Sequence, residues 1–366
     1  MTQSDLFEPC SLNGLVLQNR IVLSPVTRTR AGMDGCVGEL QATYYAQRAS
    51  AGLLITEATA VVPGGRGGAF IPGLYDDSQI TGWRQVTDAV HARGGLIFCQ
   101  LWHAGRLSHS SLNPAGGAPV APSVMQQVGK VFTANGFEAF EEARALSLEE
   151  IPALVAEFRR AAERAREAGF DGVELHGAHS YLVDAFLRDM TNRRTDAYGG
   201  SIENRARLFV EILRELVDVW GGDRVAVRLA PIGHAYNAWD SDPEPLFTHV
   251  VEQMNALGVG WLDLVEGDTG VSRKAEPGFD LQKLRKLFRG QTIANNLYDR
   301  DMAIAARQTG AADLVAFGRA FIGNPDLVER LRRNAPLVEA HPATYYGGGA
   351  RGYTDFPTLD DQEKAS

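Results

Sequence analysis

The sequence alternates short β-branched runs with longer amphipathic runs along most of its length. This alternation constrains the fold more than any other feature, because each strand followed by a helix returns the chain to begin a parallel strand. Eight βα units in one chain predict an α/β fold, specifically a (β/α)₈ TIM barrel. The strand-like runs are Arg20–Ser24, Leu53–Glu57, Leu96–Leu101, Gly172–Leu175, Arg224–Leu229, Trp261–Val265, Gln291–Ala294 and Leu314–Phe317.

Helical patterns fill the spaces between these strands. Glycines just before the next strand, at Gly52, Gly169, Gly258 and Gly310, predict left-handed helix ends. At 366 residues the chain could hold two domains, but a barrel of this length is routinely one. We therefore expect a single domain over residues 1–366. The predicted helices are Glu39–Ser50, Gln79–Arg93, Ser147–Ala168, Ile202–Trp220, Pro245–Leu257, Leu281–Phe288, Arg300–Thr309 and Pro325–Asn334.

Two segments interrupt the repeating pattern. Residues from about 104 to 146 are rich in Gly, Pro, Ser and Ala and are too long for a plain loop after the third strand. We expect them to form a capping segment, or lid, at the catalytic face of the barrel. Residues 341–366 form an aromatic, Gly-rich C-terminal extension, which could pack on the surface or form a wall of a pocket.

Charge and cysteine content exclude several classes of function. The net charge is −9, with acidic and basic residues interspersed, so we expect neither nucleic acid nor a membrane surface as a partner. The three cysteines are far apart and include no C-x-x-C pair, which excludes a disulfide framework or an iron–sulfur cluster. No signal peptide or long apolar run is recognisable. We expect a cytoplasmic protein that needs no obligate protein partner.

Three chemically useful side chains follow the fourth predicted strand. His176, His179 and Tyr181 lie within six residues, at the end of a strand where parallel α/β proteins place their chemistry. Each neutral imidazole can donate one N–H to a substrate oxygen, and the phenol can donate a proton. The pattern indicates activation of a carbonyl or nitro oxygen. A metal pair is an alternative, although no third ligand stands at a familiar spacing; a purely structural role is another.

Polar residues also follow the other predicted strands. Arg319 after Gly318 could clamp a phosphate, since barrels commonly bind phosphate beyond strands seven and eight. Arg228 in an apolar strand needs an electron-rich partner, either a ligand or a Glu of a neighbouring strand. A phosphate-binding aldolase or isomerase barrel is an alternative, although no Lys stands at a strand end. The residues that follow these strands include Thr27, Arg28, Glu57, Gln100, Trp102, Glu266, Asn295 and Asn296.

Several long motifs match a known family in their order along the chain. They include N-R-I-V-L-S-P-V-T-R-T-R-A, Q-L-W-H-A-G-R-L-S-H-S-S, H-G-A-H-S-Y-L-V-D-A-F-L and F-G-R-A-F-I-G-N-P-D-L. From about Leu6 to Leu359 the chain resembles the old yellow enzyme family of FMN-dependent ene-reductases. Within it, the chain is most similar to the bacterial N-ethylmaleimide, pentaerythritol tetranitrate and glycerol trinitrate reductases.

The resemblance implies non-covalent FMN and a ping-pong reaction in which NADPH or NADH reduces the flavin before an electron-poor alkene binds. His176 and His179 would bind the carbonyl or nitro oxygen of the substrate, and Tyr181 would protonate the α-carbon. The main activity could instead be reductive denitration of nitrate esters or attack on nitroaromatics, or the protein could bind flavin and phenols without turnover. The implied cofactor contacts are Pro25, Thr27, Ala58, Gln100, Arg228, Asn295, Asn296, Gly318 and Arg319, and the further substrate contacts are Trp102, Phe70 and Tyr346.

The chain departs from the family pattern at three places. Asn295-Asn296-Leu297 replaces a Gly-rich phosphate turn, and we expect the site to survive because Asn adopts positive φ more easily than other non-Gly residues. Gly68 stands where close relatives carry an aromatic, with Phe70 nearby. The loop after Arg228 could place Tyr236 or Trp239 over the substrate.

Overall fold

A closed barrel of eight parallel strands forms the centre of the computed structural model, which describes residues 4–237, 239–273 and 279–365. Each strand pairs with the next in chain order, and pairing of the third with the fourth is part of the closed circle. All eight coincide with the predicted runs to within two residues, which confirms the predicted barrel. The strands are β3 (Ile21–Leu23), β4 (Leu53–Ile55), β6 (Ile97–Trp102), β12 (Gly172–Gly177), β13 (Val225–Leu229), β14 (Trp261–Val265), β15 (Gln291–Asn295) and β16 (Leu314–Phe317).

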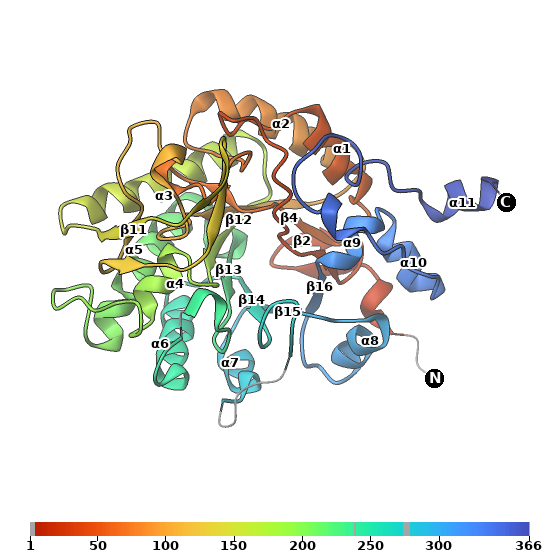
Figure 1. Ribbon diagram of the computed structural model, residues 1–366. Coiled ribbons are helices and arrows are strands. Elements are labelled where there is room, and N and C mark those ends of the chain that lie inside the picture. Colours follow the sequence, from red (N-terminus) through yellow and green to blue (C-terminus); the bar gives the residue numbers. More distant parts are fainter. Residues whose placement is uncertain (1–3, 238, 274–278, 366) are drawn as a thin grey trace.

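Helices surround this barrel on the outside (Figure 1). The eight predicted helices are present, with ends displaced by at most three residues. They are α1 (Glu39–Gln47), α2 (Asp77–His91), α3 (Glu150–Glu167), α5 (Ile202–Trp220), α6 (Pro243–Ala256), α7 (Leu281–Leu287), α8 (Arg300–Gln308) and α10 (Leu327–Arg333). Among the described residues, three short helices were not predicted: α4 (Leu182–Leu187), α9 (Arg319–Gly323) and α11 (Leu359–Ala365). The 3₁₀ turns are Asp5–Phe7, Pro63–Gly65, Ser110–Leu112, Gly222–Arg224, Ala235–Asn237 and Pro342–Thr344.

The glycines that were predicted to end helices serve two different purposes. Gly169, Gly258 and Gly310 have φ of 85°, 70° and 67°, as a left-handed helix end requires. The prediction for Gly52 was wrong, because Gly52 is not among the residues with positive φ. A Cβ at Gly52 would lie 2.0 Å from the carbonyl oxygen of Asn19, so close backbone packing is what requires glycine there.

One end of the barrel interior is apolar. Inward side chains such as Phe98 and Trp261 form this layer, and their rings meet edge to face at 6.0 Å. A hairpin of β1 (Cys10–Leu12) and β2 (Leu15–Leu17) packs Leu15 and Leu17 against the layer. The hairpin and the apolar layer thus close one end of the barrel. The polar side chains lie toward the opposite end, where the strands finish.

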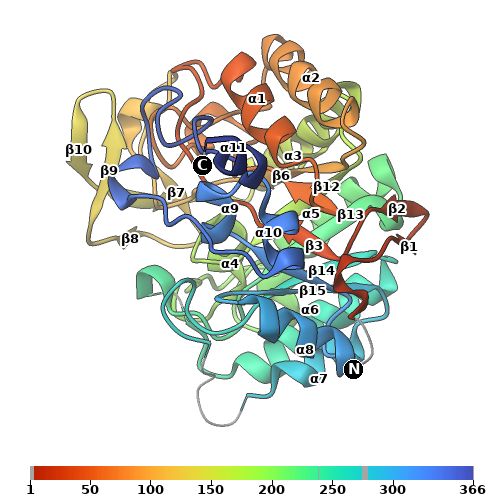
Figure 2. The ribbon, with the colours of Figure 1, turned by 90° about the vertical axis from the view of Figure 1, so that its right-hand side faces the viewer.

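The segment after β6 contains five short strands. They are β7 (Val120–Ala121), β8 (Met125–Gln126), β9 (Lys130–Thr133), β10 (Gly136–Ala139) and β11 (Glu142–Ala145). β11 lies between β7 and β8, while β9 and β10 form a separate hairpin. Figure 2 shows this hairpin on the side of the molecule away from β1 and β2. A two-residue strand, β5 (Thr59–Ala60), also pairs with β6. The β9–β10 hairpin of this segment therefore lies away from the end of the barrel that β1 and β2 close.

The C-terminal extension is clamped to α1 by buried arginines and stacked tyrosines. Tyr353 stacks on Tyr44 with ring centroids 4.1 Å apart, and the guanidinium of Arg48 lies 3.7 Å from the centroid of Tyr44. Arg28 donates from Nε to the carbonyl of Tyr345 at 2.9 Å. These contacts hold the part of the extension between Tyr345 and Tyr353 against the barrel. Ser366, the last residue of the predicted extension, lies outside the described residues.

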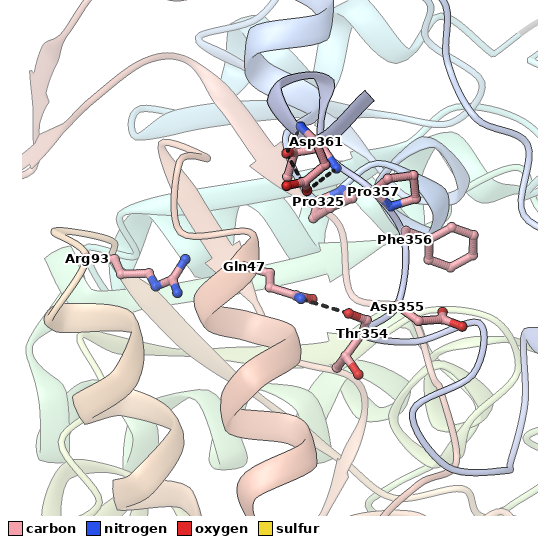
Figure 3. Close-up of a pocket in the computed structure, with 9 residues that line it drawn as sticks. Gln47, Arg93, Pro325, Thr354, Asp355, Phe356, Pro357 and Asp361 are labelled. Atoms are coloured by element: carbon pink, nitrogen blue, oxygen red, sulfur yellow. Dashed lines mark hydrogen bonds between the residues drawn. The ribbon is translucent and has the colours of Figure 1, made fainter. Parts of the chain in front are cut away.

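A cavity of about 420 Å³ lies between α1 and this extension (Figure 3). Gln47 donates to the carbonyl of Thr354 at 2.9 Å on its wall. None of the predicted site residues lines it. Across the described ranges, no helix combines the length and apolarity needed to cross a membrane.

Candidate active site

The two histidines and the tyrosine predicted from the sequence meet at the end of β12. The ring centroid of His176 lies 5.5 Å from that of His179 and 4.9 Å from that of Tyr181. Trp102, at the end of β6, packs edge to face on Tyr181 at 4.9 Å. His176 is buried, whereas His179 and Tyr181 are partly accessible. The strand end therefore presents two imidazoles and a phenol to the same space.

A strained turn brings these side chains together. His179 and Ser180 have φ of 59° and 68°, which places two consecutive non-Gly residues in the left-handed region. Asp184 accepts the N–H of Ser180 at 2.8 Å and pairs with Arg188 at 2.8 Å. Arg106 donates to the hydroxyl of Ser180. We did not predict these supporting residues, and their sequence signal is only their position inside the family motifs.

Hydrogen bonds indicate how the two imidazoles can donate. The N–H of Ala178 donates to Nδ1 of His176 at 3.3 Å, which leaves Nε2 of that ring to carry the proton. Nε2 of His179 lies 2.6 Å from the hydroxyl oxygen of Thr269, in the loop after β14. Each ring thus keeps one nitrogen for a ligand.

Burial keeps all three groups uncharged at neutral pH. It lowers the pKa of His176 well below its usual value, and the nearby His179 and Arg228 lower it further. Burial lowers the pKa of His179 to about 3, again helped by Arg228. Burial raises the pKa of Tyr181, and the neighbouring phenols of Tyr236 and Tyr346 add to the increase. Both imidazoles are therefore neutral donors, and the phenol keeps its proton.

A layer of polar side chains lies inside the barrel near this cluster. Arg228, only 4% exposed, pairs with Asp263 on the adjacent strand β14. A partner for Arg228 is thus present within the protein. It is an Asp of a neighbouring strand, whereas the alternatives considered from the sequence were a ligand or a Glu. Asn295 donates to Asp263 at 3.1 Å and to the hydroxyl of Ser24 at 3.0 Å. Its side chain therefore joins this layer.

Glu174 is the least satisfied member of the polar layer. Its Oε1 accepts from Gln100 at 2.7 Å, while its buried Oε2 has no hydrogen-bond partner among the described residues. Burial, followed by the charge of Asp263, raises the pKa of Glu174 to about 8. A buried oxygen without a partner is costly, so this layer is suited to a polar ligand above it.

The ends of β15 and β16 form the predicted phosphate region. Asn296 has φ of 98°, as expected for a replacement of glycine, and Leu297 has φ of 52°. The side chain of Asn296 donates to the carbonyls of Glu266 at 2.6 Å and Asp268 at 3.0 Å, and so holds the loop after β14. Since the side chains of both asparagines are engaged, contacts to a phosphate would come from their backbone.

Gly318 and Arg319 occupy the end of β16 and the start of α9. Arg319 is exposed, and its guanidinium lies against Gly270, where any added Cβ would collide with it. A Cβ at Gly318 would lie 3.3 Å from Val26, so the backbone there is closely packed. An exposed guanidinium beside this closely packed strand end fits a phosphate group. Together with Gln100 and Arg228, these residues fit a flavin nucleotide.

Aromatic side chains gather near Tyr181, where Phe140 belongs to an apolar cluster against which Phe70 and Tyr181 both pack. Phe70, with φ of 59°, lies 6.3 Å from Phe132 of β9, and Phe140 lies 6.3 Å from Tyr236. The capping segment thus contributes two aromatics that we did not predict. The indole N–H of the buried Trp102 has no partner within the described part of the chain. Tyr346 and Trp239 are 66% and 40% exposed.

Acid should destabilise the protein through His103. Burial lowers the pKa of this residue, which is 4% exposed, from 6.5 to about 4. Its folded pKa lies below the unfolded one, so the stabilisation is present above pH 6.5 and is lost as pH falls toward 4. By pH 5 we expect a loss of about 2 kcal/mol. Urea unfolding at pH 7.5 and 5, with FMN saturating, should show a smaller loss for His103→Gln, and an unchanged pH dependence would contradict this assignment.

The comparisons with known proteins agree with this geometry. Residues 5–337 match the model of the NADH:flavin oxidoreductase / NADH oxidase family, a family of FMN proteins. The chain is 42% identical to 12-oxophytodienoate reductase 7 of Oryza sativa subsp. japonica, covering 98% of this chain and 95% of that protein.

Solved structures give the same result. A structure of the old yellow enzyme homologue from Zymomonas mobilis has a TM-score of 0.92 and 42% identity, covering 97% of this chain and all of that one. Morphinone reductase in complex with tetrahydroNAD has a TM-score of 0.93 and 43% identity, covering 98% and 99% of the two chains. The chain therefore belongs to the NADH:flavin oxidoreductase / NADH oxidase family, as an old yellow enzyme-like reductase whose cofactor is FMN.

Proposed function

We propose that this protein uses NADPH or NADH to reduce the activated C=C bond of α,β-unsaturated carbonyl or nitro compounds in a ping-pong cycle. The observation that carries the proposal is the convergence of two neutral imidazoles and a protonated phenol at the end of β12. The relatives' names, morphinone reductase and 12-oxophytodienoate reductase, support a ketone-bearing substrate, and the tetrahydroNAD complex supports a nicotinamide reductant. We expect the enzyme to act in the reducing cytoplasm.

The proposed cofactor site follows the strand ends. FMN, when bound, accepts hydride from the nicotinamide and delivers it to the β-carbon of the alkene. Arg228 would favour negative charge on the ring, although Asp263 offsets part of its charge. Gln100 belongs to the same polar layer through its hydrogen bond to Glu174. The proposed ring contacts are Pro25, Thr27, Ala58, Gln100 and Arg228, and the proposed phosphate contacts are Gly318, Arg319 and the backbone of Asn295 and Asn296.

The proposed roles of the chain's own residues follow from their protonation. His176 and His179 each donate one N–H to the carbonyl or nitro oxygen and stabilise the negative charge that develops there. Tyr181 gives its phenolic proton to the α-carbon. Trp102, Phe70 and Tyr346 would line the substrate space.

Absorption spectroscopy of the purified protein tests this function directly. The flavin band should bleach with anaerobic NADPH and return when 2-cyclohexenone is added. Double-reciprocal plots of the initial rate against one substrate, at several fixed concentrations of the other, should be parallel lines, as a ping-pong cycle requires. Turnover of a nitrate ester that exceeds turnover of the enone would instead favour denitration as the main activity.

Replacing His176 should separate substrate binding from cofactor binding. We expect His176→Ala to weaken a carbonyl ligand such as 4-hydroxybenzaldehyde about tenfold, because one hydrogen bond to the ligand oxygen is lost. Its FMN content should match that of the unmodified protein. His91→Ala, which alters a half-exposed histidine on α2 paired with Asp171, is the matched control. Loss of flavin together with misfolding in His176→Ala would show that His176 is structural.

A further inference from the structure

The two imidazoles must hold their protons on different nitrogens to serve one substrate oxygen. A neutral imidazole has a single N–H, and the partner of the other nitrogen decides which nitrogen carries it. In His176 the backbone N–H of Ala178 donates to Nδ1, so the proton is on Nε2. In His179 it is Nε2 that contacts a protein group, the hydroxyl of Thr269 at 2.6 Å. Nδ1 is therefore the nitrogen of His179 that remains for substrate.

We propose that the hydroxyl of Thr269 donates to Nε2 of His179 and so holds the proton of that ring on Nδ1. Thr269 is then a positioning residue for the substrate oxygen, and it acts through His179 rather than by touching substrate. The proposal rests on the function proposed above, in which both imidazoles donate to one oxygen. With the opposite hydrogen-bond direction, Nδ1 would present a lone pair to that oxygen and repel it.

The surrounding structure presents Thr269 in a fixed position. Asn296 accepts the N–H of Gly270 at 2.7 Å and donates to the carbonyls of Asp268 at 3.0 Å and Ser272 at 3.1 Å, on either side of this turn. Asp268 accepts the N–H of His234 at 2.9 Å, which joins the turn to the loop after β13. The residue that hydrogen-bonds His179 is thus anchored from two neighbouring strand ends.

Burial and nearby positive charges keep His179 uncharged at neutral pH. Tautomer choice matters only while the ring is neutral, because a protonated imidazole donates from both nitrogens. Burial and the nearby charges of Arg228 and Arg188 lower the pKa of His179 to about 3. His179 is therefore a single-proton donor throughout the working range, and the direction of the Thr269 bond decides where it donates.

Two substitutions at Thr269 test this role in the FMN-bound enzyme. Thr269→Val keeps the shape of the side chain and removes the hydroxyl, while Thr269→Ser keeps the hydroxyl. We expect Thr269→Val to weaken binding of 4-hydroxybenzaldehyde and raise KM for 2-cyclohexenone about tenfold, with Thr269→Ser within about twofold of the unmodified enzyme. Thr309→Val, at the exposed end of α8, is the matched control.

Nitrogen-15 shifts of labelled histidine report the tautomer itself. The unmodified enzyme and Thr269→Ser should show His179 protonated on Nδ1, and Thr269→Val should show a mixture or the opposite form. An unchanged tautomer and unchanged ligand affinity in Thr269→Val would overturn the proposal. FMN content and bleaching by NADPH are measured in the same samples: their retention with no effect of Thr269→Val rejects this inference alone, whereas absence of flavin from the unmodified protein rejects the proposed function.

Discussion

Tyr181→Phe should slow alkene reduction by about 10²–10⁴-fold and leave NADPH oxidation at the rate of the unmodified enzyme. Only the step that completes the alkane needs a proton at the α-carbon, and the phenol is the proposed acid. Its position against His176 and Trp102, with ring centroids 4.9 Å away in both cases, places it beside the group that would hold the substrate oxygen. Phenylalanine preserves that packing and removes the proton.

Rapid mixing of the two half-reactions measures this effect. Bleaching of the flavin by NADPH should be unchanged in Tyr181→Phe, while its return with 2-cyclohexenone should be slow. Tyr198→Phe is the control, because Tyr198 bonds to Glu211 at 3.0 Å outside the proposed site. Equal rates for both half-reactions in Tyr181→Phe would remove this residue from the role of acid.

The pH dependence of the same step gives a second check. Burial raises the pKa of Tyr181 above its usual value of about 10. The phenol therefore stays protonated through the neutral range, and the rate of alkene reduction should not fall between pH 6 and pH 9 through loss of this proton. A decline centred near pH 8 in that step would point to another acid.

Asp184→Ala should lower the free energy of unfolding by about 3–5 kcal/mol, because it leaves the buried guanidinium of Arg188 without its counter-charge. The side chains of Asp184 and Arg188 are 1% and 2% exposed, so water cannot replace the lost partner. Arg188 also donates to the carbonyls of Ala230 and Pro231 after β13 at 2.7 Å and 3.0 Å. Removal of Asp184 therefore disturbs two strand ends.

The same substitution should affect the active site, since Asp184 accepts the N–H of Ser180 in the left-handed turn. Asp184→Asn retains an acceptor for that N–H and should keep more substrate affinity than Asp184→Ala. Lys283→Ala, which breaks the exposed pair with Glu244, should leave the urea midpoint nearly unchanged in the same titration. An equally small change for Asp184→Ala would show that the turn is held by other contacts.

The sequence alone was enough to predict the barrel. Strand and helix periodicities are local properties, so they can be recognised before the fold is known. Each of the eight strands lies at its predicted run, and His176, His179 and Tyr181 are together because they follow one strand. The resemblance to old yellow enzymes, read from motifs that span most of the chain, agrees with the family found by comparison.

Which residues from different strands meet depends on the three-dimensional arrangement of the strands. Asp263 faces Arg228 because β13 and β14 pair in a particular register, and Thr269 meets His179 across 90 positions of sequence. Gly52 is required by a carbonyl from Asn19, 33 positions before it, rather than by its own backbone angles. Such contacts depend on barrel closure, which brings distant strand ends side by side, and a local pattern contains no information about which distant partner will be there.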